Sequence, residues 1–144
     1  MPDDDLSQPT QICPGCGAVL VALPDGGPAH PGASAACSRL FEVTLRGLRE
    51  DAGAHAAAAA TIALADAAYD AQHPVPGDEG RLRAALQRLG AGADLADRTG
   101  RPEAWRTTIA DVAADLDVID LPVLVESWGR SVQEDWATTA AVRD

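Results

Sequence analysis

The sequence predicts a mainly α-helical protein: a bundle of four to five helices with a small N-terminal segment that resembles a zinc knuckle. The first reason is composition. Apolar residues make up 47% of the 144-residue chain but aromatic residues only 3%, so alanine, leucine and valine must form most of the core, and alanine has the highest helix propensity. The second reason is a group of three cysteines and one histidine within residues 13–37, which is typical of a small metal site.

The length of the chain fits one domain, divided into three parts. Residues 1–11 are polar and acidic, and we expect a disordered lead-in. Residues 12–37 hold the cysteines among glycines and prolines and form the predicted metal-binding segment. In it, the alternation of Val19, Val21 and Leu23 predicts a short strand after the CPGCG turn. Residues 38–144 form the helical bundle, which packs with that segment.

Capping residues and breaks in apolar periodicity delimit the helices. Ser34 can cap a first helix that ends near Gly53, and the second runs to about Gln72, where the sequence His73-Pro74 stops it. A third is predicted from Asp78 to Leu89. Further along come a short helix or loop over residues 91–108, a short helix over 109–116, and a last helix after Asp120 that runs towards Val142.

The net charge of −11 argues against two classes of partner. Phosphate groups of nucleic acids and anionic membrane surfaces would both be repelled. We see no signal peptide, because the acidic start lacks a positive region followed by an apolar run, and no stretch reaches the ~20 apolar residues of a membrane span. We therefore expect a cytoplasmic protein with a small-molecule substrate or a protein as its partner. The sequence does not determine the oligomeric state.

The four clustered residues predict a tetrahedral zinc site with Cys13, Cys16, His30 and Cys37 as ligands. His73 and His55 are the alternatives for the fourth ligand. Three thiolates make zinc a poor Lewis acid, which favours a structural role over a catalytic one. Redox use of the CxxC pair is the other interpretation, but a thioredoxin-like motif would follow a strand and begin a helix.

A second group of polar residues lies on the second predicted helix. Asp66, Asp70 and His73 follow a spacing of i, i+4 and i+7, with Tyr69 beside them. His73, Asp66 and Tyr69 are the candidate acid–base residues; the alternative is a solvated helix face with a histidine favoured by the helix dipole. Trp128 and Trp136, two turns apart on the last helix, are either core residues or the wall of a substrate pocket.

The chain resembles DUF5946, a family of small bacterial proteins of unknown function. The resemblance rests on four blocks of sequence: Cys13-Pro-Gly-Cys-Gly-Ala18, the residues His30 and Cys37, the run Asp66-Ala-Ala-Tyr-Asp-Ala-Gln-His-Pro74, and Trp128-Gly-Arg-Ser-Val132 followed by Trp136. The resemblance implies a helical, metal-associated fold. It does not assign an activity, because the function of the family is unknown. The chain departs from the family pattern where Ile62 and the stretch 138–140 replace histidines, which implies that a second metal site has been lost here or that its cavity serves another use.

Two hypotheses of different class follow. The first is an enzyme that acts on a small organic, specialised-metabolite substrate by acid–base chemistry, in a pocket between the second and last helices. The second is a non-catalytic, zinc-stabilised binding or accessory module for a protein partner. The first predicts a cavity reached by the candidate residues, and the second predicts an exposed apolar patch. A thiol- or metal-handling role is a third possibility.

Overall fold

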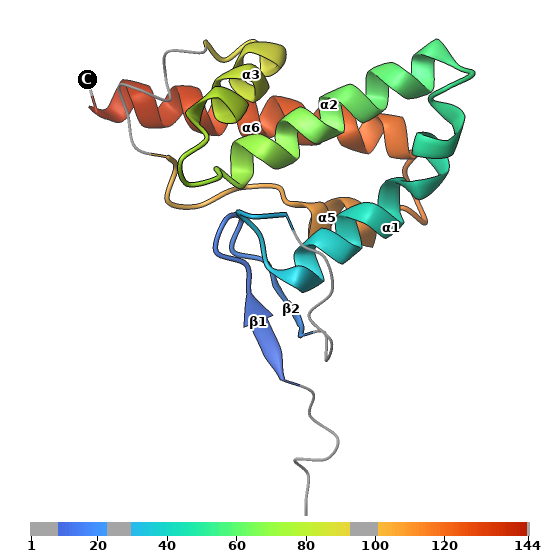
Figure 1. Cartoon of the computed structure of the whole chain (residues 1–144), viewed down its shortest axis with the longest axis horizontal. Coiled ribbons are helices and arrows are strands. Elements are labelled where there is room, and N and C mark those ends of the chain that lie inside the picture. The colour runs from blue at the N-terminus through green and yellow to red at the C-terminus, as the bar shows by residue number, and fades with distance from the viewer. Residues whose placement is uncertain (1–8, 23–29, 93–100, 144) are drawn as a thin grey trace, which may run out of the picture.

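The computed structural model describes residues 9–22, 30–92 and 101–143. In this part of the chain, helices dominate and one small two-stranded sheet accompanies them (Figure 1), which confirms the predicted mainly α-helical fold. The elements are β1 (Thr10–Ile12), β2 (Val19–Val21), α1 (Ala35–Asp51), α2 (Ala56–Gln72), α3 (Glu79–Leu89), α5 (Ile109–Ala114) and α6 (Leu121–Arg143).

The helix ends follow from local side-chain chemistry. Ser34 is the N-cap of α1 and its hydroxyl accepts a hydrogen bond from the backbone of Cys37 at 3.1 Å. Asp78 caps α3 in the same way, and Gly90 ends that helix in the left-handed conformation that glycine tolerates best. The short helix α5 begins after Thr108 as predicted but stops at Ala114, two residues before its expected end.

The N-terminal segment is a β-hairpin around the CPGCG turn. The strand predicted from Val19, Val21 and Leu23 is β2, which covers residues 19–21, and Leu23 lies outside the described residues. β2 pairs antiparallel with β1, which brings Ile12 opposite Val19. Thr10 and Gln11 were expected in a disordered lead-in but belong to the strand β1. The strand β2 needs a partner for its backbone N–H and C=O groups, and β1 supplies it. The rest of that lead-in, residues 1–8, lies outside the described residues.

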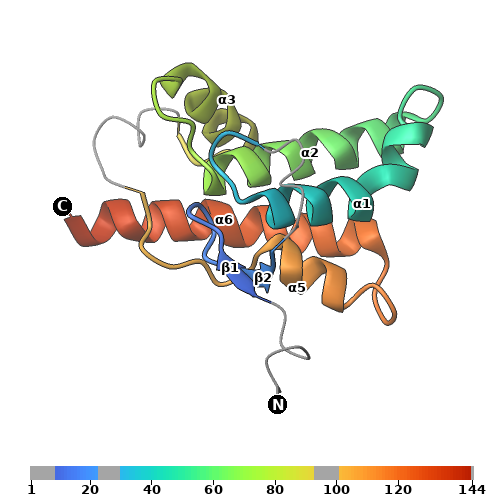
Figure 2. The same ribbon diagram turned by 60° about the horizontal axis from the view of Figure 1, so that its bottom comes forward.

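Helix α2 is the central element of the bundle and packs against α6, α3 and α1. Figures 1 and 2 show α2 and α6 side by side, with the hairpin below them near the N-terminal end of α1. Ala65, Ala68 and Ala71 are fully buried along α2. Such small side chains let neighbouring helices approach closely, and Trp128 and Trp136 of α6 provide the bulk that alanines lack.

Within the described ranges, no helix combines the length and the apolar character that crossing a bilayer requires.

Candidate metal centre

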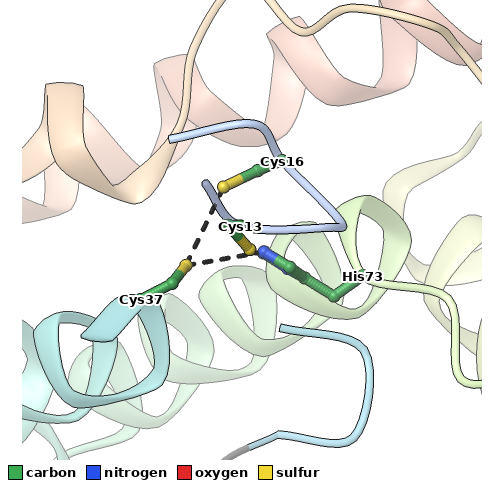
Figure 3. Close-up of side chains that lie close together, drawn as sticks. All are labelled: Cys13, Cys16, Cys37 and His73. Atoms are coloured by element: carbon green, nitrogen blue, oxygen red, sulfur yellow. Dashed lines mark hydrogen bonds between the residues drawn. The ribbon is translucent and has the colours of Figure 1, made fainter. Parts of the chain in front are cut away.

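Four buried side chains from three separate segments meet where the CPGCG turn of the hairpin faces α1 and α2 (Figure 3). Figure 3 shows Cys13 and Cys16 on the CPGCG turn, Cys37 on α1 and His73 at the end of α2, all pointing towards one another. Their ligand atoms lie within 4.8 Å of each other, and none of the four residues is more than 6% exposed. Such a group of three cysteines and one histidine could hold a metal ion.

The CPGCG turn supports its two sulfurs with backbone N–H groups. The backbone of Cys16 hydrogen-bonds to the Cys13 thiol, and the backbone of Ala18 hydrogen-bonds to the Cys16 thiol. The turn is closed by Cys13 N–H to Ala18 O at 2.9 Å and Gly17 N–H to Cys13 O at 3.0 Å. Gly17 has φ +79°, a conformation that most other residues adopt only at a cost.

Cys37 occupies the first turn of α1, where the positive end of the helix favours a thiolate. Its own helix directs the neighbouring backbone N–H groups along the helix axis, so the sulfur needs a donor from elsewhere. Tyr69 of α2 supplies one, because its hydroxyl donates to Cys37 Sγ at 3.2 Å. Each of the three sulfurs therefore has a hydrogen-bond donor from the protein.

His73 joins the group because α2 ends there. The backbone N–H of His73 bonds to Asp70 O at 3.2 Å, which leaves the carbonyl of Tyr69 without its helical partner. The ring of His73 takes that place, with Nδ1 donating to Tyr69 O at 2.6 Å. Since Nδ1 carries the proton, Nε2 presents a lone pair to the sulfurs, 3.6 Å from Cys37 Sγ. Metal-binding histidines are commonly oriented in this way.

The structure does not bring His30 into the group, contrary to the sequence prediction, and His73 takes that place. The backbone N–H of Gly32 donates to His30 Nδ1 at 3.0 Å, so Nε2 must carry the proton, and it donates to Asp70 at 2.8 Å. No lone pair is left to bind a metal. His55, the other alternative, is exposed at the start of α2 and is not part of the group.

Two glycines permit the close approach of the turn to α2. A Cβ atom on Gly15 would clash with the ring of His73 and lie 2.8 Å from the carbonyl oxygens of Gln72 and Gly32. A Cβ atom on Gly32 would lie 2.8 Å from Pro74 O. The CPGCG motif thus needs its first glycine for packing against the histidine as well as for the turn itself.

The three thiols share negative charge unequally. Hydrogen bonds from the thiols of Cys16 and Cys37 lower the pKa of Cys13 far below its ordinary value. The hydrogen bond to Cys13 raises the pKa of Cys16 to about 11, and the hydrogen bonds to Cys13 and Cys16, together with burial, raise that of Cys37 further still. Full deprotonation of all three therefore requires a cation among them.

The three candidate acid–base residues do not face a common space, because Tyr69 and His73 both approach Cys37 Sγ whereas Asp66 lies apart from them. His73 points its lone pair at the sulfurs. Burial raises the pKa of the Tyr69 phenol, and its hydrogen bond to Cys37 raises it further, so Tyr69 is a donor and not a base. Asp66 lies on the surface, where its carboxylate pairs with Arg49 at 2.6 Å.

Asp70 links the segment before α1 to α3. It accepts hydrogen bonds from His30 at 2.8 Å and from Arg81 Nε at 3.1 Å. Burial raises the pKa of its carboxyl, but the hydrogen bonds from His30 and Arg81 and the charge of Arg81 outweigh that effect and hold the pKa below its ordinary value. The sequence pattern favoured a solvated role for Asp70; the structure places it in this ion pair.

Trp128 and Trp136, the candidate substrate-pocket residues, lie in the core at 0% and 1% exposure. Trp128 donates its indole N–H to Gln72 Oε1 at 3.1 Å, and Trp136 donates to Ala71 O at 3.1 Å. Both bonds hold the end of α2 that carries His73. The two bonds fix the backbone and side chain next to His73. This agrees with the interpretation of both tryptophans as core residues.

Two residues that sequence analysis did not connect with the site brace its outer side. Trp105 donates its indole N–H to Gly15 O at 3.0 Å, and Arg101 donates to Pro14 O at 3.0 Å. Gln72 is a third, since its amide also reaches Thr107 O at 2.7 Å. The only sequence signal for any of them was the position of Gln72 next to the His73-Pro74 break.

Comparison with known proteins gives one match, to a family model described as a family of unknown function, DUF5946, over residues 11–94. The chain belongs to this family. The match includes all four residues of the metal group, and the bracing residues Trp105, Trp128 and Trp136 follow it in the chain. No curated protein matches the chain, and no solved structure does.

Proposed function

We propose that the four residues bind one zinc ion. The observation that carries the proposal is the spacing of the donor atoms. Zn–S bonds of about 2.3 Å at tetrahedral angles put two sulfurs about 3.8 Å apart, and a Zn–N bond of about 2.05 Å puts a sulfur and a nitrogen about 3.6 Å apart. Cys16 Sγ lies 3.8 Å from Cys37 Sγ, and Cys37 Sγ lies 3.6 Å from His73 Nε2.

The zinc is structural in this proposal. Four protein donors complete a tetrahedral shell and leave no position for water or substrate. Three thiolates leave the site with a net negative charge, which weakens zinc as a Lewis acid. The ion would connect the N-terminal turn, the start of α1 and the end of α2, three segments that are up to 60 residues apart, from Cys13 to His73. Its binding energy would therefore contribute directly to folding.

The protein as a whole is, in our proposal, a non-catalytic binding module for a protein partner rather than an acid–base enzyme. The candidate residues of the enzyme hypothesis are engaged elsewhere. A hollow of about 320 Å³ between α2 and α3 is lined by Asp66 and Asp70, but neither Tyr69 nor His73 belongs to its lining. A hollow of about 440 Å³ lies over the CPGCG turn and is bordered by none of these three candidates.

The net charge of −11 directs the proposal towards a basic partner. Exposed apolar side chains at two separate places support the proposal: Ile12 and Val19 of the hairpin, and Val118 beyond α5, are each more than half exposed. Monomeric proteins seldom leave large clusters of such side chains uncovered.

The metal content of the purified protein tests the zinc proposal. We expect one zinc per chain by mass spectrometry of the metals. Cys13→Ser should bind no zinc and should no longer unfold cooperatively. His55→Ala, which removes an exposed histidine outside the group, should keep the zinc and the cooperative unfolding transition. A protein purified without metal, with thiols that form a disulfide readily, would overturn the proposal in favour of redox chemistry. Zinc that leaves without any loss of structure would overturn the structural role.

A further inference from the structure

The turn between α5 and α6 exposes a group of aliphatic side chains. Four of them lie within eight residues and form what we define as the turn patch: Leu116 (39% exposed), Val118 (80%), Ile119 (39%) and Val123 (53%). Val118 is the most exposed of all the large apolar side chains in the described part of the chain. In Figures 1 and 2 this turn lies away from the hairpin, at the end of the bundle where α6 begins.

The fold does not need these aliphatic side chains in order to form the turn. Its backbone is closed by hydrogen bonds from the N–H groups of Val118 and Ile119 to the carbonyl of Asp115, both at 3.0 Å. The core contacts on either side come from other residues, since Val112 before the turn and Val125 after it are buried. Polar side chains would serve such a turn equally well, so closing the turn does not account for the exposed apolar surface of the turn patch.

The sequence on both sides of the turn patch is acidic. Residues 107–129 contain five acidic residues and no lysine or arginine. The charge of Asp120 is favourable at the start of α6, but Asp115 is the C-cap of α5, where the helix dipole disfavours a negative charge. Asp117 belongs to no helix. Local helix energetics therefore explain only part of the negative charge around the turn patch.

We propose that the turn patch binds a basic amphipathic helix of a partner protein. The aliphatic side chains would contact the apolar face of that helix, and the carboxylates would pair with lysine or arginine on its flanks. A second copy of this chain fits poorly, because it would bring two sets of carboxylates together at a net charge of −11 per chain. This inference rests on the proposed function as a binding module and names its partner-binding surface.

The test uses a defined probe, a fluorescent synthetic Leu–Lys peptide that folds as an amphipathic helix. A scrambled peptide with the same composition but no apolar face controls for charge alone. Fluorescence anisotropy measures binding to the zinc-loaded full chain, to Val118→Ser/Val123→Ser, and to Val19→Ser. The last variant removes an aliphatic side chain of similar exposure, 59%, from the hairpin. Metal content and circular dichroism are recorded for each protein.

We expect the helical peptide to bind the native chain and Val19→Ser equally, and the turn-patch variant about tenfold more weakly, because truncating buried anchors of an interface has effects of this size. The inference is overturned if all three proteins bind alike, if the scrambled peptide binds as well as the helical one, or if no protein binds. It is also overturned if sedimentation shows a dimer that the turn-patch variant dissociates. The metal content of each protein tests the zinc proposal separately. A failure of the zinc proposal can therefore be distinguished from a failure of the turn-patch inference.

Discussion

The CPGCG turn and the α5–α6 turn are both short connections, but the fold surrounds them very differently. At the CPGCG turn, Cys13 and Cys16 are buried, each sulfur has a donor, and Trp105 and Arg101 bind the carbonyls from outside. At the α5–α6 turn, the backbone is closed by two hydrogen bonds and the side chains extend into solvent. The first turn is specified by contacts within the chain, and the second leaves apolar surface for contacts with another molecule.

This difference has a physical origin in composition. With aromatic residues at only 3%, the core is built mainly from alanines, leucines and valines around two buried tryptophans, and it has few large side chains to order a distant N-terminal segment. A metal ion held by the four residues of the group, as we propose, would provide that order. Loss of contacts at the CPGCG turn should therefore disturb the whole fold, and changes at the α5–α6 turn should not.

The largest expected effect separates the two histidines near the metal group. His73→Ala should weaken zinc binding by more than about a hundredfold, because loss of a ligand costs more than the 10–100-fold typical of its supporting residues. His30→Ala, the matched control, should retain zinc, since its ring nitrogens bond to Gly32 and Asp70. Competition with a chromogenic chelator measures both affinities. The reverse order of the two variants would restore His30 as the ligand.

The next effect is steric. Gly15→Ala should destabilise the zinc-loaded protein by about 1–3 kcal/mol, the usual cost of overpacking, because the new methyl group would clash with the ring of His73. Gly47→Ala has open space around it within α1, and should instead stabilise the protein by about 0.5–1 kcal/mol. Urea unfolding compares the two variants. Equal stability of both would mean that Gly15 is not in close contact with His73.

A smaller effect should follow removal of one hydroxyl. Tyr69→Phe keeps the ring that stacks on Phe41 at 3.9 Å but removes the hydrogen bond to Cys37. We expect zinc affinity to fall about 10–100-fold while the fold persists. In the cobalt-substituted protein, the sulfur-to-metal charge-transfer bands should shift, because one thiolate loses its donor. Unchanged affinity together with unchanged bands would show that the hydroxyl does not support Cys37.

The smallest effect belongs to the α5–α6 turn. Val118→Ser should change the free energy of unfolding by no more than about 0.5 kcal/mol, as for surface substitutions in general, because the side chain is 80% exposed. Thermal unfolding of the zinc-loaded protein measures it against Val125→Ser, a substitution of a fully buried residue of α6 that should cost several times more. A large loss with Val118→Ser would mean that the turn patch stabilises the monomer.

Much of the fold could be predicted because its signals are local. Ser34 and Asp78 have side chains that cap a helix in reach of their own backbone, and Gly90 has the freedom that a helix end requires. The three cysteines of the metal group could be predicted for the same reason. The CxxC spacing and the third cysteine in the first turn of a helix are features of short sequence segments. The sequence did not predict the strand β1, because a run of only three residues, Thr10–Ile12, is too short to show an alternating apolar pattern.

The sequence by itself determined most of the helices, the three cysteines of the candidate metal group and the negative charge of this protein. Only the tertiary structure decided between His30 and His73. That choice depends on how α2 packs against α1, on the carbonyl of Tyr69 left free at the helix end, and on the backbone of Gly32 reaching His30 first. Residues 40 positions apart, such as His30 and Asp70, become partners through packing. Local propensity carries no information about that distance, because its interactions extend over only a few residues along the chain.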